Sequence, residues 1–183
     1  MAEKKATSGT PFIEGERINL CPPNMDNLNL YVKWMNSPHT RKYARYEFPQ
    51  TIEEVKKLFE PKEESVKNQI FFEIWHKENK KPIGYVGLIR INWFNRHALI
   101  FYMIGEIEYW GNNLATEAGK LVINYAFNEL NLHKITADVY TQNIASIRVS
   151  EKIGLKFEIT RKNEVYIDGA YIDVLKYSLL KNK

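Results

Sequence analysis

The sequence predicts one α+β domain whose central sheet is mixed, mostly antiparallel, and built from about seven strands with about four helices. Three neighbouring strand-like segments with short links indicate an antiparallel meander. A long amphipathic helix between two further strand segments indicates a parallel, right-handed βαβ unit. With 183 residues, 44% of them hydrophobic, the chain suits one ordinary core. We expect the domain to span residues 12–183 behind a flexible tail, residues 1–11.

The first third of the chain predicts one strand and two helices. Residues 17–21 have strand character, and two following prolines stop the strand because proline cannot donate to a sheet ladder. Asn24 or Asp26 can cap a helix with helically spaced apolar residues that ends at residues 36–38. Thr51, with acidic residues in the next turn, begins the second helix.

The rest of the chain predicts six strands and two helices. Strand segments are rich in aromatic and β-branched residues, while the longer helix shows apolar residues on one face. Gly154 ends the shorter helix as a C′ glycine, and Asp168-Gly169 marks a hairpin turn. The expected strands are residues 70–75, 82–91, 98–105, 135–140, 157–162 and 171–180, and the expected helices are residues 114–130 and 143–153.

Composition narrows the classes of function. A single cysteine, Cys21, excludes an intrachain disulfide and a cysteine metal cluster, and the four histidines are not paired for a metal, so we expect no metal. The net charge of +4 is spread along the chain without an RNA-binding signature, so we expect no nucleic-acid partner. No apolar run is long enough to span a membrane, and residues 1–10 lack a secretory apolar segment. We therefore expect a cytoplasmic protein with no membrane partner.

Residues 104–118 carry the most informative pattern. A strand end, a turn of small residues and a helix start follow one another, which gathers unpaired backbone N–H groups at the positive end of a helix dipole. Gly111, Asn112 and Asn113 all tolerate positive φ. The pattern is typical of a diphosphate-binding turn. An ordinary βα turn capped by asparagine is the alternative.

The same stretch, Trp110 to Ala118, resembles motif A of the GCN5-related N-acetyltransferases (GNAT), in the branch grouped with the ribosomal-protein N-terminal acetyltransferases (RimJ/RimL-type). The resemblance extends over most of the chain, in order and on matching elements. The further similar segments are residues 14–20, 34–38, 81–88, 143–146, 151–155 and 166–173.

This resemblance implies the acyl-CoA N-acyltransferase fold, acetyl-CoA as acyl donor and direct transfer to an amine. By that analogy, backbone groups of Ile104 and Gly105 bind the pantetheine amides. Asn143 would bind the pantetheine arm beside Ser146, or cap the following helix, and Lys152 would meet phosphate or stay a solvated charge. The implied donor-binding residues of the turn are Trp110, Gly111, Asn112, Asn113, Leu114, Ala115 and Thr116.

The sequence departs from the family pattern at two positions. Asn113 stands where the motif has a glycine that lets the backbone approach the diphosphate. Ser150 stands where many relatives carry a tyrosine that protonates the departing thiolate, and it is the candidate at that position. Because serine is a poor acid, the alternatives are a water, another residue or departure of the thiolate as such. These two departures favour the alternative function, a catalytically degenerate module that binds acetyl-CoA.

Transfer to an amine also needs a base and an amine close to the thioester. Glu106 is the preferred candidate base, acting through water, with Glu108 second and Tyr109 as a further proton route. Each of the two carboxylates could instead simply face solvent.

The acceptor is less defined by the sequence. Segments 41–48 and 92–97 are aromatic and basic, which suits an anionic or sugar-like amine. The family resemblance implies a protein N-terminal amine, these segments suggest an amino sugar, and a polyamine is ranked lower because no acidic cluster is visible. A homodimer is possible.

Overall fold

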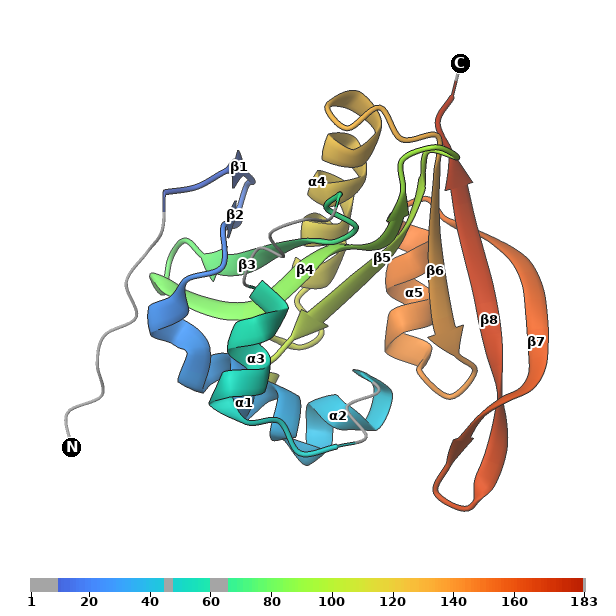
Figure 1. Cartoon of the computed structure of the whole chain (residues 1–183), viewed down its shortest axis with the longest axis horizontal. Coiled ribbons are helices and arrows are strands. Elements are labelled where there is room, and N and C mark those ends of the chain that lie inside the picture. The colour runs from blue at the N-terminus through green and yellow to red at the C-terminus, as the bar shows by residue number, and fades with distance from the viewer. Residues whose placement is uncertain (1–9, 45–47, 60–65, 183) are drawn as a thin grey trace.

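The structure is a computed structural model that describes residues 10–44, 48–59 and 66–182. Within these residues, eight strands form one sheet in the order β1-β2-β3-β4-β5-β6-β8-β7, with five α-helices packed around it (Figure 1). The strands are β1 (Ile13–Glu14), β2 (Ile18–Cys21), β3 (Ile70–His76), β4 (Lys81–Asn92), β5 (His97–Ile104), β6 (Lys134–Tyr140), β7 (Lys156–Ile167) and β8 (Ala170–Leu180).

The helices follow the predicted positions closely. They are α1 (Leu28–Asn36), α2 (Pro38–Ala44), α3 (Ile52–Phe59), α4 (Leu114–Asn128) and α5 (Ile144–Lys152), with short 3-10 turns η1 (Met25–Asn27) and η2 (Ile107–Tyr109). The start of α3 shows the expected reciprocal cap, in which Thr51 N–H donates to Glu54 Oε2 at 2.9 Å and Glu54 N–H donates to Thr51 Oγ1 at 3.2 Å.

Two elements were not predicted, β1 and α2. β1 covers two residues, too few for a period of hydrophobicity to show. α2 begins at Pro38, which the sequence treats as the end of the preceding helix. Proline also suits the first position of a helix, because its fixed φ is helical and its missing N–H is not needed there. Pro38 therefore ends one helix and begins the next.

The sheet contains one parallel pair of strands, β5 with β6, within an otherwise antiparallel arrangement of the described residues. This confirms the predicted βαβ unit around α4. The parallel pairing runs from His97↔Lys134 to Leu99↔Thr136. Beyond those pairs β5 and β6 diverge (Figure 1), while β6 stays paired with β8 along its whole length. We call the opening between the diverging ends of β5 and β6 the strand gap.

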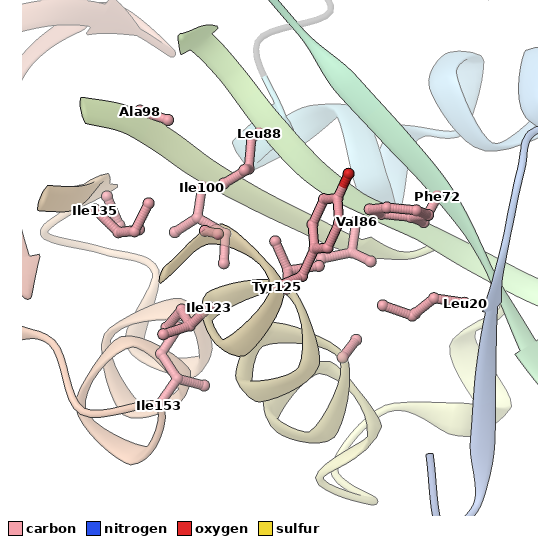
Figure 2. Packing of buried hydrophobic residues seen from close by; sticks show 14 of the residues in the cluster. Leu20, Phe72, Val86, Leu88, Ala98, Ile100, Ile123, Tyr125, Ile135 and Ile153 are labelled. Carbon is pink, nitrogen blue, oxygen red and sulfur yellow. The ribbon is translucent and has the colours of Figure 1, made fainter. Parts of the chain in front are cut away.

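Two hydrophobic clusters lie on opposite faces of the sheet. The larger contains side chains from α4, α5 and the strands, and Figure 2 shows Ile100, Ile123, Tyr125, Ile135 and Ile153 meeting in it. The smaller joins α1 and α3 to β4 and β5. Its buried members are Tyr31, Trp34, Met35, Val55, Tyr85 and Met103. Alternation along β5 explains the division, since Ile100 faces one cluster and Met103 the other.

A buried carboxyl group lies beneath α1. Glu73 on β3 is 1% exposed, and its Oε2 accepts hydrogen bonds from Asn27 Nδ2 at 2.8 Å and Tyr31 Oη at 2.5 Å. Its Oε1 is buried with no hydrogen-bond partner among the described residues. Burial raises the pKa of Glu73, while the hydrogen bonds from Tyr31 and Asn27 oppose that rise.

Candidate functional site

The backbone of β5 opens into the strand gap. Gly105 N–H donates to Ile83 O on β4 at 2.8 Å. Because antiparallel residues alternate in the direction of their polar groups, the backbone of Ile104 and Tyr102 turns the other way, toward β6. β6 has already parted from β5 at this level. An extended ligand with amide groups could therefore pair with β5 here.

The turn after β5 has the conformation that the sequence predicts. Gly111 has φ +79° and Asn113 has φ 60°, both left-handed, whereas Asn112 between them does not have positive φ. α4 begins at the residue after Asn113. A Cβ added to Gly111 would meet nothing within 4 Å, so the turn is open beside this residue. The N-terminal amides of α4, together with the helix dipole, make this turn suitable for an anion.

Three side chains from different elements fix the turn. Trp110 Nε1 donates to Ile104 O at 2.8 Å, Arg17 Nη1 donates to Asn112 O at 2.9 Å, and Lys152 Nζ donates to Asn113 Oδ1 at 2.7 Å. Lys152 thus brings a positive charge from the end of α5 to the predicted anion site. The carbonyl of Asn112, and not its side chain, meets Arg17.

Asn113 shows what a side chain does at the motif glycine. Asn113 adopts the left-handed conformation, which asparagine tolerates with less strain than most residues other than glycine. Its Oδ1 is bonded to Lys152, so the side chain is directed toward α5.

Sequence reasoning missed Arg17 and Glu117. Glu117 Oε2 accepts from Arg17 Nε at 3.1 Å, and its Oε1 accepts from the Arg17 backbone N–H at 2.8 Å. The two residues lie 100 positions apart, and an acid in the first turn of a helix is already explained by the dipole. The sequence therefore contains no signal that would have paired them.

Asn143 acts as the N-cap of α5, since Ser146 N–H donates to Asn143 Oδ1 at 3.1 Å. This confirms the capping role proposed for it, while its contact with pantetheine stays a prediction. Ala115 and Thr116 lie in the first turn of α4, after Leu114.

Ser150 is fully buried and faces β5. Its Oγ lies 3.0 Å from the Tyr102 hydroxyl, which also donates to Ser146 O at 3.0 Å and lies 3.0 Å from Ser146 Oγ. Burial raises the pKa of Tyr102, and the hydrogen bonds with Ser146 and Ser150 oppose that rise. The sequence suggested no role for Tyr102 because it fits the strand pattern like its neighbours.

Glu106 is fixed to α1 just past the end of β5. Its Oε1 accepts from Trp34 Nε1 at 2.7 Å and from Lys33 Nζ at 3.2 Å, and its side chain is 14% exposed. Gly105 packs directly on Trp34, because an added Cβ would lie 2.2 Å from Trp34 Cγ.

The other two candidates for proton transfer face the β3–β4 hairpin. Glu108 is exposed and pairs with Lys81 at 3.1 Å; a hydrogen bond from its own backbone and the Lys81 contact lower the pKa of Glu108. Tyr109 Oη accepts from Asn79 Nδ2 at 2.6 Å. The structure therefore does not bring Glu108 and Tyr109 to the strand gap.

The two expected acceptor segments lie at opposite ends of β5. Segment 41–48 begins within α2, near the end of β5, although residues 45–47 lie outside the described residues. Segment 92–97 connects β4 to the start of β5, where Trp93 Nε1 donates to Lys67 O at 2.6 Å. Residues 98–104 of β5 separate segment 92–97 from Gly105, and its place in the acceptor region stays a prediction.

Comparison with known proteins decides the family. A family model described as "Acetyltransferase (GNAT) domain" matches residues 17–156, which include β2 to α5 and the turn before α4. The chain belongs to the GNAT acetyltransferase family. As a member of this family it is an acetyl-CoA-dependent N-acetyltransferase, and its sheet with covering helices is the GNAT fold.

The relatives of this chain in the GNAT family differ in whether their names specify a substrate. An uncharacterized N-acetyltransferase p20 of Bacillus licheniformis is 28% identical over 172 residues, 92% of this chain and 95% of the relative. A spermidine N(1)-acetyltransferase of Escherichia coli K12 is 34% identical over 100 residues, about half of each chain (55% and 53%). The crystal structure of spermidine N-acetyltransferase from Vibrio cholerae in complex with CoA and spermine superposes with a TM-score of 0.80 at 27% identity, covering 90% of this chain and 95% of that one.

Metal-ligand clusters and long apolar helices are both absent from the described residues. Across residues 10–44, 48–59 and 66–182, no three His, Cys, Asp or Glu side chains lie close enough together to hold a metal ion. In the same part of the chain, no helix combines the length and apolar character needed to cross a membrane.

Proposed function

We propose that the enzyme transfers the acetyl group of acetyl-CoA directly to a primary amine while both substrates are bound, and that the amine is a protein N-terminus or an amino sugar. The observation that carries the proposal is the continuity of the strand gap with the fixed turn before α4. Backbone groups of Ile104 face the gap, and the turn beside it offers helix amides and Lys152. A thioester arm and a diphosphate are joined in one molecule of acetyl-CoA, which matches this pairing of features.

The residues of this chain fit that donor. Amides from Gly111 to Ala115 would hold the diphosphate, with the Lys152 ammonium adding charge, and Ile104 would pair with the pantetheine arm. The N–H of Gly105 already donates to Ile83 O, and the carbonyl of Ile104 already accepts from Trp110 Nε1. We therefore assign the Ile104 N–H and the backbone groups of Tyr102 to the ligand. Acetyl-CoA supplies an acetyl group activated as a thioester.

Direct transfer is favoured over an acyl-enzyme by the state of the cysteine. Burial, and the nearby Glu73 carboxylate, raise the pKa of the Cys21 thiol to about 11. A thiol of this kind is protonated at neutral pH and a poor nucleophile. We therefore assign attack on the thioester to the acceptor amine, with Glu106 as candidate base through water and Ser150 as candidate acid.

The charge around α1 and α2 favours an acceptor that is not a polycation. Residues 27–44, which include α1 and α2, contain Lys33, Arg41 and Lys42 and no aspartate or glutamate. These helices lie on the face of the sheet opposite α4, from which an acceptor would approach the strand gap. Like charges repel, so a protein N-terminus or an amino sugar suits this face better than spermidine. The RimJ/RimL branch, a homodimer and a cytoplasmic location stay predictions.

Two measurements test the proposal. Isothermal titration with acetyl-CoA, compared with desulfo-CoA, should give a dissociation constant in the micromolar range, about −8 kcal/mol. Thiol release should then be followed with N-terminal peptides, amino sugars and spermidine, and the Glu106→Gln variant should lower kcat about 100-fold. Binding of acetyl-CoA without thiol release from any amine would instead support the degenerate module.

A further inference from the structure

We propose that Tyr102 donates the proton to the departing thiolate, and that Ser146 and Ser150 hold its hydroxyl for this task. The assignment rests on the proposed function, in which it replaces Ser150 as the acid and keeps Ser150 as a positioning residue for Tyr102. It moves the phenol from α5, where many relatives are expected to carry it, to the facing strand β5.

Tyr102 occupies the right place along the strand gap. It lies three residues beyond Leu99, the last residue of β5 that pairs with β6, and its side chain reaches across to α5. It is partly buried at the edge of the larger hydrophobic cluster. Ile104, the neighbouring residue on the same face, lies between Tyr102 and the diphosphate turn, so an arm extending from the turn along β5 passes Ile104 before it reaches the phenol.

Ser150 is too deeply placed to meet a ligand by itself. It is 0% exposed, and its hydroxyl contacts the Tyr102 hydroxyl at 3.0 Å. A serine in this position leaves space that a tyrosine on α5 would fill, and the phenol from β5 uses that space. The departure at residue 150 and the tyrosine at residue 102 are therefore two parts of one arrangement.

The hydrogen bonds around the phenol allow it to give up its proton. The hydroxyl donates to the carbonyl oxygen of Ser146. This oxygen also accepts the regular helical hydrogen bond from the N–H of Ser150 within α5. Rotation of the phenolic O–H toward the gap therefore does not leave that carbonyl unsatisfied. The hydroxyls of Ser146 and Ser150, each 3.0 Å away, can then donate to the phenolate oxygen.

The step balances as follows. The amine nitrogen forms a bond to the thioester carbon, the carbon–sulfur bond breaks, and the sulfur takes the electron pair of that bond. The sulfur then receives the phenolic proton of Tyr102. The proton lost by the amine nitrogen passes to water, and the phenolate regains a proton from water. Amide and free thiol are the products, and Tyr102 is unchanged at the end of the cycle.

The first test is the Tyr102→Phe variant with Tyr166→Phe as its matched control, since Tyr166 is an exposed tyrosine on β7. We expect Y102F to lower kcat about 10- to 100-fold, with KM for both substrates and the acetyl-CoA affinity by titration within about twofold. Y166F should match the wild type. The Y102F/S150Y double variant, which returns a phenol to α5, should recover much of kcat. Equal kcat in Y102F and the wild type would overturn the assignment.

A spectroscopic measurement on the protein without ligand gives an independent check. The tyrosinate absorbance of the wild type minus that of Y102F reports the titration of Tyr102. Ser150→Ala removes one hydroxyl that lowers the pKa of Tyr102, so the titration should move to higher pH while thermal unfolding shows a folded protein. No movement in S150A would contradict the role given to Ser150. If no amine supports thiol release by the wild type, the proposed function fails; if the wild type is active and Y102F equally so, the assignment alone fails.

Discussion

The two faces of the sheet are built in different ways. On the α4 and α5 face, the turn before α4 is fixed by Arg17, Trp110 and Lys152, each of which bonds a group in or beside the turn. On the α1 and α3 face, six aromatic rings pack against one another, and a carboxyl group is buried beneath them. The rings are Tyr31, Trp34, Phe59, Phe71, Tyr85 and Phe101.

This difference has a functional meaning. A binding site for a charged group gains affinity when its hydrogen-bond donors are already fixed, because no side chain or loop then loses entropy when the ligand binds. The aromatic face provides a packed apolar surface instead of preset donors. Gly105 and Glu106, which lead from β5 toward the turn before α4, connect this segment to the aromatic face, since both contact Trp34.

The largest effect is expected where the faces meet. Gly105→Ala would place a Cβ 2.2 to 2.5 Å from three atoms of the Trp34 ring, so strand or helix must shift. We expect the free energy of unfolding to fall by about 3 kcal/mol and activity to be largely lost. Urea unfolding, followed by tryptophan fluorescence, measures the first effect.

Gly111→Ala provides the matched control for that variant. Gly111 has φ +79° but open space around its missing Cβ, so the cost should be conformational alone, about 1 kcal/mol. If both glycine variants lose equal stability, steric contact with Trp34 does not join the faces as described.

A smaller effect is expected for the cation at the turn. Lys152→Met removes the ammonium that bonds Asn113 Oδ1, so acetyl-CoA should bind about 10-fold more weakly, with a shallower dependence on salt. Isothermal titration at two salt concentrations measures this. Lys162→Met, which removes an exposed lysine paired with Asp173 on the C-terminal hairpin, should leave the affinity unchanged. An equal loss in both variants would show only a general charge effect.

The buried carboxyl group on the other face predicts a dependence of stability on pH. Burial raises the pKa of Glu73 above its ordinary value of 4.5, so the folded state holds this proton more tightly than the unfolded state. The folded protein is therefore favoured at low pH and loses this advantage as pH rises through the folded pKa. Unfolding at a series of pH values above 5 should show wild-type stability falling relative to Glu73→Gln, by about 1–2 kcal/mol.

The control for Glu73 is Glu53→Gln, at an exposed position in the first turn of α3. Its stability should follow that of the wild type across the same pH range. A wild type whose stability runs parallel to that of E73Q would contradict a raised pKa for Glu73.

The smallest effect is expected for Lys33→Met. Lys33 bonds Glu106 at 3.2 Å, but its side chain is 66% exposed, so water and salt screen the pair. We expect a change in unfolding free energy below about 1 kcal/mol. Trp34 still donates to Glu106, so the carboxylate should stay in position. A loss of several kcal/mol on chemical unfolding would show that Lys33, rather than Trp34, fixes the end of β5.

The two faces also differ in how far the sequence predicted them. The turn before α4 is one contiguous stretch of sequence, so residue type alone predicted its conformation. Gly111 and Asn113 are of the two residue types that favour the left-handed conformation, and both adopt it. Arg17 and Glu117, and the contact of Tyr102 with Ser150, depend on pairing between distant segments, which no local pattern reveals. The loop 92–97 was assigned to the acceptor on residue type alone, and strand direction places it at the end of β5 opposite Gly105.

The short parallel seam between β5 and β6 has one more consequence. It divides the sheet into two unequal panels, β1–β5 and β6–β8, that share pairing from His97↔Lys134 to Leu99↔Thr136. A molecule lodged in the strand gap touches both panels and so acts as a tie between them. Binding of a ligand in the strand gap is then thermodynamically linked to the pairing of β5 with β6. The enzyme with acetyl-CoA bound should therefore resist heat, protease and hydrogen exchange across this pairing more than the free enzyme.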